Sequence, residues 1–127
     1  MDFMNGIGYI LHDYQREIIK KVCLNIENQK KMQTILLPNT GGKTSLSFIL
    51  AIKFKEDGKK VLYYADEGAD YSKKYYAAHA IRTDAYRFEG IDFGDISNIK
   101  NLYENHYDIV ITDAIHSVFS KEVLNDF

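Results

Sequence analysis

Two short, uninterrupted apolar runs limit the folds open to this chain. VLYYA spans residues 61–65, and DIVITD, at residues 108–113, places four apolar or β-branched residues between two acids. Strands that are apolar on both faces are typical of a parallel sheet covered by helices, because helical crossovers bury both faces. Helix-like patterns at residues 43–55 and 71–81 alternate with these runs. The sequence therefore predicts an α/β fold with a mainly parallel sheet.

The rest of the chain predicts further elements around this core. Apolar residues recur at helical spacing from Asp13 onward, and Asp13 is placed to cap the first turn. The β-prone residues 34–37 predict a strand that stops at Pro38. Weaker patterns predict three more elements, which are a short strand at 86–88, a short helix at 96–103 and a helix from Ser120.

Length and composition exclude several classes of protein. A chain of 127 residues can bury one core but cannot form two full-sized domains. A net charge of -2 gives no overall attraction to nucleic acid or anionic lipid. The uncharged apolar runs are far shorter than the roughly 20 residues of a membrane span, and no signal peptide is evident. The single cysteine, Cys23, excludes an internal disulfide. We expect one cytoplasmic domain covering residues 1–127, with no membrane partner.

A glycine-bearing loop separates the predicted strand at 34–37 from the helix that begins at Lys43. Residues 36–44 read LLPNTGGKT. In such a loop, small residues let backbone N–H groups point inward, and the following helix adds its positive end. The Lys43 ammonium would contact the β and γ phosphates of a nucleotide, and the Thr44 hydroxyl would bind Mg²⁺. The alternative is a glycine turn with an exposed lysine.

This loop resembles the Walker A loop, PTGxGKT, of the first RecA-like domain of superfamily 2 helicases and related restriction-enzyme translocases. Pro38 and the run from Gly42 to Thr44 match at the family spacing, and the resemblance implies nucleotide binding by Thr40, Gly41, Gly42, Lys43 and Thr44. Thr40 stands where the family has glycine, and threonine resists the positive φ that glycine takes freely. The resemblance covers about residues 10–120. It implies a three-layer RecA-like P-loop fold, with ATP and Mg²⁺ as cofactors and reduced nucleotide affinity.

The final strand resembles the one that ends in the DEAD/DEAH box of the same family. Asp113 falls at the Mg²⁺-binding aspartate and His116 at the histidine, whereas Ala114 replaces the glutamate that orients the attacking water. Loss of a general base costs a factor of roughly 100 to 10,000 in rate. We also expect no second RecA-like domain to supply arginine fingers. The resemblance therefore implies a domain with no catalytic residue, which binds Mg-ATP weakly and hydrolyses it poorly or not at all.

Three smaller features leave alternatives open. Gln15 falls where related proteins have a glutamine that reads adenine, or it is a helix-capping surface residue. Asp66 and Glu67 follow an apolar strand and could form a metal-and-base pair, or they are solvated acids. Lys73 and Lys74 fall where the helicases touch the nucleic-acid backbone, or they lie on a solvated helix face.

Abundant tyrosine provides a second hypothesis about function. The chain has ten Tyr and seven Phe, and such rings pack in cores, anchor protein interfaces or stack on bases. We rank core packing first, a protein partner second and nucleic acid third, because the net charge is -2 and most cations are lysine. The alternative function is a non-enzymatic pseudo-helicase that contacts a helicase, nuclease or defence complex, as a small phage-encoded, anti-CRISPR-like inhibitor would. A third is a subunit that completes its site with another chain.

Overall fold

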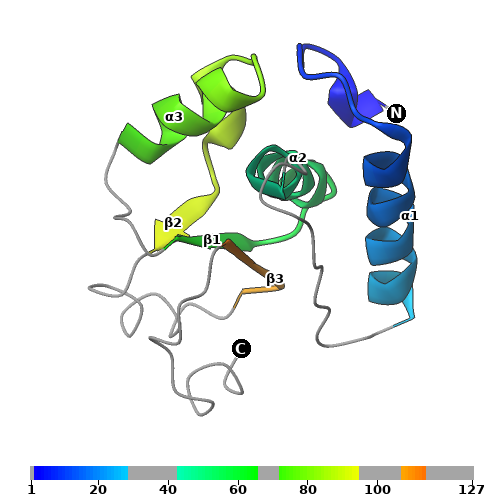
Figure 1. Cartoon of the computed structure of the whole chain (residues 1–127). Helices are drawn as coiled ribbons and strands as arrows, with labels where there is room; N and C mark the ends of the chain where they lie inside the picture. The colour runs from blue at the N-terminus through cyan, green and yellow to red at the C-terminus, as the bar shows by residue number, and fades with distance from the viewer. Residues whose placement is uncertain (1, 29–42, 66–71, 95–106, 114–127) are drawn as a thin grey trace.

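The computed structural model describes residues 2–28, 43–65, 72–94 and 107–113 (Figure 1). Its helices are the 3-10 helices η1 (Asp2–Met4) and η2 (Ala85–Phe88) and the α-helices α1 (Asp13–Glu27), α2 (Lys43–Glu56) and α3 (Ser72–Ala80). Its strands are β1 (Val61–Ala65), β2 (Asp92–Gly94) and β3 (Ile109–Asp113). These bounds confirm the three main predicted helices and the two apolar strands. The elements predicted at 34–37, at 96–103 and from Ser120 lie outside the described residues.

The described strands form one parallel sheet in the order β2-β1-β3. Leu62 in β1 is paired with Asp92 in β2, and Ala65 in β1 is paired with Asp113 in β3. Because the strands run in one direction, their carboxyl ends lie at the same edge of the sheet. The mixed helix and strand content and the parallel pairing confirm the α/β class.

Helix α2 is the centre of the hydrophobic core. It lies over the sheet, with α3 on one side and α1 on the other (Figure 1). Phe48, Ile49 and Ile52 are buried, and the Phe48 ring lies 4.9 Å from the Tyr63 ring and 6.0 Å from the Phe88 ring, centroid to centroid. A helix packed against neighbours on several sides needs apolar residues around most of its circumference. The burial of residues 48–52 explains why this run is apolar at every position.

Strand β1 buries side chains on both faces of the sheet. Val61 and Tyr63 join the core that contains α2, whereas Leu62 and Tyr64 belong to a second buried cluster with Val110 and Tyr107 packed against it. Successive strand residues point to opposite faces, so an uninterrupted apolar run is required when both faces are covered. The helices that the structure describes lie on one face of the sheet (Figure 1), so a three-layer arrangement stays a prediction.

The prediction of a strand at residues 86–88 is wrong. Residues 85–88 form η2, and the edge strand β2 follows at Asp92–Gly94. The adjacent side chains of Arg87 and Phe88 are both buried, 9% and 0% exposed. A strand would send them to opposite faces, whereas adjacent side chains of a 3-10 turn lie about 120° apart, which lets both be buried against neighbouring elements.

The start of α1 also differs from its prediction. The N-cap residue is His12, and Asp13 is the first residue of the helix, where its carboxylate lies 3.6 Å from the Arg16 guanidinium. Tyr14, assigned to the apolar face by its spacing, is 43% exposed. The buried residues of the helix are Gln15, Ile19 and Val22. The inner face therefore includes Gln15 in place of Tyr14. Across the described ranges, no helix has the length and apolar character needed to cross a bilayer.

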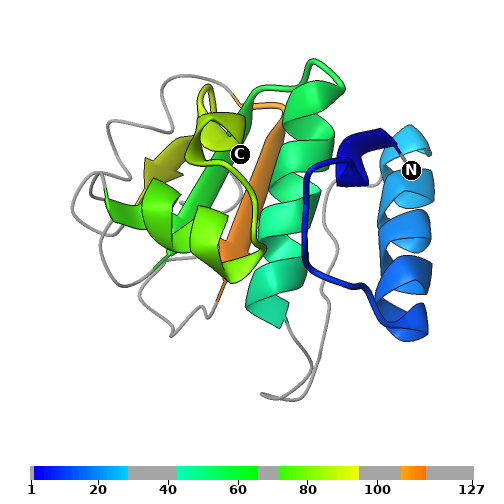
Figure 2. The same cartoon turned by 90° about the horizontal axis from the view of Figure 1, so that it is seen from above.

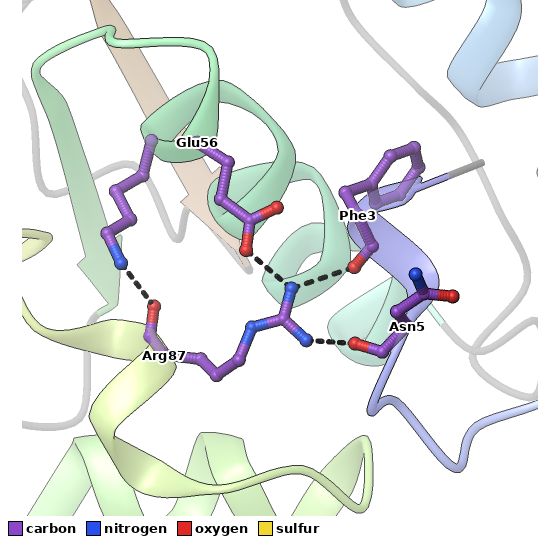
Figure 3. Close-up of polar contacts among 5 residues, drawn as sticks. Phe3, Asn5, Glu56 and Arg87 are labelled. Atoms are coloured by element: carbon purple, nitrogen blue, oxygen red, sulfur yellow. Dashed lines mark hydrogen bonds and ion pairs between the residues drawn. The ribbon is translucent and has the colours of Figure 1, made fainter.

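Arg87 ties the N-terminal segment to the end of α2 (Figure 3). Its guanidinium donates hydrogen bonds to the carbonyl oxygens of Asn5 and of Phe3, the latter at 2.9 Å. The same group forms an ion pair with Glu56 in α2, with Nη2 2.5 Å from Oε1. The carbonyl oxygen of Arg87 accepts a hydrogen bond from the Lys55 ammonium at 3.1 Å. One side chain therefore links η1, α2 and η2.

A close backbone approach makes Gly8 a sensitive position. Its N–H donates to the carbonyl oxygen of Arg82 at 2.9 Å, and a Cβ at position 8 would lie 2.8 Å from the Arg82 Cβ. Gly8→Ala should therefore lower the free energy of unfolding by about 1–3 kcal/mol through overpacking. Arg82 has φ of 53°, a left-handed conformation that glycine takes freely, so Arg82→Gly should be neutral or stabilising by up to about 1 kcal/mol.

The double variant Gly8→Ala/Arg82→Gly tests this explanation. It removes the Cβ that the new alanine would meet, so we expect it to recover most of the stability lost in Gly8→Ala, with a coupling of about 1 kcal/mol or more. Urea unfolding of the wild type, both single variants and the double variant measures that coupling. Additive effects would show that the contact between positions 8 and 82 is not the cause.

Candidate site at the carboxyl edge of the sheet

The beginning of α2 and the ends of the strands lie at one edge of the sheet. A short connection at residues 57–60, with Gly58 at φ of 84°, reverses the chain between α2 and β1. Helix α2 therefore runs opposite to the strands and begins where they end. Figure 2 shows the orange strand β3 pointing toward the teal first turn of α2. Because α2 begins at Lys43 and β3 ends at Asp113, the fold brings the backbones of these two residues to the same edge.

The electrostatics of α2 favour an anion at this edge. The first turn contains no acidic residue, and the last turn carries Lys53 and Lys55. The lysines complement the negative end of the helix dipole, whereas the N–H groups of the first turn keep their positive character. Gly41 and Gly42 directly precede this turn in the sequence. Phosphate groups are the anions that commonly bind at such helix starts.

Two residues at this edge carry oxygen atoms of the kind that Mg²⁺ binds. Thr44, which is half-buried in the first turn of α2, carries a hydroxyl, and Asp113 carries a carboxylate. Mg²⁺ prefers oxygen ligands and is commonly bound by one or two protein groups together with substrate phosphates and water. In the described part of the chain, no three His, Cys, Asp or Glu residues are grouped to hold a metal.

Several predicted site positions lie outside the described residues. They are Thr40, Gly41 and Gly42 of the loop, the acids at 66–67, and the box positions 114 and 116. β1 ends at Ala65, which is paired with Asp113, so the acidic pair follows in sequence from the same edge of the sheet. The nucleotide-binding role of these positions stays a prediction.

Gln15 is buried inside the protein and caps helix α1. The residue is 0% exposed. The Oε1 atom accepts a hydrogen bond from the backbone N–H of His12 at 2.8 Å, and Nε2 donates one to the Tyr9 hydroxyl at 3.1 Å. Of the two interpretations of Gln15, helix capping therefore describes this side chain, although the side chain is buried and not at the surface. Contact with adenine would require this buried side chain to become accessible.

Tyr9 and His12 are the partners that sequence reasoning did not identify. A glutamine three residues after the N-cap residue has the spacing of a capping box, and this signal could have indicated the hydrogen bond from the His12 backbone N–H to Gln15. The Tyr9 backbone N–H also donates to the carbonyl oxygen of Ile81 at 3.2 Å. Through Tyr9, the amide of Gln15 connects the start of α1 to the end of α3.

Replacing Gln15 distinguishes its two interpretations. Gln15→Ala removes two hydrogen bonds from a buried position, so we expect the free energy of unfolding to fall by about 1–3 kcal/mol. Tyr9→Phe removes one of the partners and should cost about 1 kcal/mol. Chemical unfolding measures both effects. If Gln15→Ala kept the stability of the wild type but weakened ATP binding relative to GTP binding, the adenine-reading interpretation would be correct.

Among the residues that the structure describes, Cys23 and Lys53 have shifted pKa values, and both lie away from this edge. Burial raises the pKa of the Cys23 thiol, an effect that the nearby Lys53 ammonium opposes. The pKa of Lys53 is itself raised, because its ammonium donates a hydrogen bond to Asp57 at 2.5 Å, while partial burial opposes the rise. Lys53 and Asp57 lie at the opposite end of α2 from Lys43. Neither shift therefore supplies an acid or base to the candidate site.

Comparisons with known proteins do not assign the chain to a family. No match was found with protein-family models, with curated proteins or with solved structures. The function considered below therefore rests on the residues of this chain and on their arrangement.

Proposed function

We propose that this chain is a degenerate, helicase-like nucleotide-binding domain with a RecA-like, three-layer P-loop fold. It binds Mg-ATP weakly and hydrolyses it poorly or not at all. One observation carries the proposal, which is that α2 begins at Lys43 on the edge where β1 and β3 end, with Asp113 as the last residue of β3. A strand, a glycine-bearing loop and a helix in this order place backbone N–H groups and a lysine beside a phosphate.

The division of roles follows from the chemistry of each residue. Lys43 would hold the β and γ phosphates, while the loop positions 40–42 would offer backbone N–H groups to them. Thr44 and Asp113 would bind Mg²⁺, which neutralises phosphate charge when bound. Thr40 replaces a family glycine, so any loop conformation with positive φ there costs about 1–2 kcal/mol and weakens binding.

Poor hydrolysis follows from the residue after Asp113. Ala114 has no group that accepts a proton or orients water, whereas the family has glutamate at this position. A bound γ-phosphate would therefore face a water molecule with no general base beside it. Binding without turnover is the expected behaviour of such a site.

Mg-ATP should raise the melting temperature of the protein. A ligand present at ten times its dissociation constant stabilises the folded state by about 1.4 kcal/mol, which is roughly 5 °C for a domain of this size. Lys43→Ala should abolish most of this rise because it removes the ammonium that contacts the phosphates. Differential scanning fluorimetry with ATP, with and without Mg²⁺, measures the effect.

Lys59→Ala is the matched control for this experiment. Lys59 is exposed in the connection between α2 and β1, at the opposite end of the helix from Lys43. Its replacement should leave the rise caused by Mg-ATP unchanged. A melting curve that does not move at millimolar Mg-ATP, or an equal rise in Lys43→Ala, would refute the proposed nucleotide site.

Protein–protein contact is the second candidate function, and the exposed tyrosines favour it. Core packing accounts for Tyr63 and Tyr64, which are buried, but Tyr75, Tyr76 and Tyr86 are 53%, 55% and 64% exposed. Tyrosine is enriched in the binding hot spots of protein interfaces. In this alternative, the chain is a pseudo-helicase that contacts a helicase, nuclease or defence complex. It would then show no response to Mg-ATP, so the melting experiment separates the two candidates.

A further inference from the structure

We draw no further inference here: the strongest candidate, the exposed aromatic surface formed by Tyr75 and Tyr76 on α3 and Tyr86 on η2, carries none because nothing in the structure shows what covers it.

Discussion

Arg87→Met is expected to lower the free energy of unfolding by about 3–5 kcal/mol, because it removes two hydrogen bonds from a charged donor to backbone carbonyl oxygens, each worth about 1.5–3 kcal/mol. The guanidinium of Arg87 donates hydrogen bonds to the carbonyl oxygens of Phe3 and Asn5 and forms an ion pair with the Glu56 carboxylate (Figure 3). Methionine preserves much of the side-chain volume but donates no hydrogen bond. The loss therefore measures the polar contacts and not a cavity.

Most of this loss should come from the two carbonyl groups. A hydrogen bond from a charged donor contributes about 1.5–3 kcal/mol to stability. A buried carbonyl oxygen that loses its donor destabilises the folded state further, because it has given up its hydrogen bonds to water without a replacement. The Glu56 side chain is 36% exposed, so water can solvate its carboxylate once Arg87 is gone. Glu56→Gln is therefore the control, and we expect it to cost no more than about 1 kcal/mol.

Arg87→Lys should lie between these two variants. A lysine ammonium is a single point of charge and cannot match the planar fork that reaches three oxygens at once. Urea unfolding measures all three variants, and amide hydrogen exchange over residues 2–9 should accelerate in Arg87→Met. Stability within about 1 kcal/mol of the wild type in Arg87→Met would show that these contacts do not hold the N-terminal segment.

Ala114→Glu is expected to raise the rate of ATP hydrolysis by about 100- to 10,000-fold over the wild type. The new carboxylate follows Asp113 directly, at the position where the resembled helicases carry the residue that orients water. The gain requires that Lys43, Thr44 and Asp113 already hold Mg-ATP. Release of inorganic phosphate under single-turnover conditions measures it.

Two further variants test whether any gain comes from the proposed site. Ala114→Gln has the same length as glutamate but no basic carboxylate, so it should stay near the wild-type rate. Adding Lys43→Ala to Ala114→Glu should remove the gain, because the phosphates lose their ammonium partner. No gain in Ala114→Glu, in a protein that still binds Mg-ATP, would show that more than the general base is missing. No gain together with no binding would favour a fold retained for protein contact.

The strands differ in how well the local sequence pattern predicts them. β1 and β3 were predictable because each is an uninterrupted apolar run, and such runs are stable only where both faces of a sheet are covered. β2 carries no such signal, since Asp92, Phe93 and Gly94 include one large apolar side chain. Its pairing with β1, in which Phe93 lies opposite Tyr63, makes it a strand. That pairing depends on residues 30 positions earlier in the chain.

The phosphate and metal site stays a prediction from the sequence, and the structure adds only that α2 begins at Lys43 and that β3 ends at Asp113. Only one of the two hydrogen-bond partners of Gln15 could be predicted from the sequence. One of them, His12, lies three residues away and has a recognisable spacing, whereas the Tyr9 hydroxyl comes from the segment that precedes the helix.

By itself, the sequence determined the parallel α/β class and the positions of α2, β1 and β3, because apolar periodicity and run length are properties of neighbouring residues. Only the tertiary structure decided that Gln15 and Arg87 belong to the interior. A polar side chain is stable there when partners satisfy its hydrogen bonds. For Arg87 those partners include Phe3, 84 positions away in the chain, and no local pattern reports a contact at that distance.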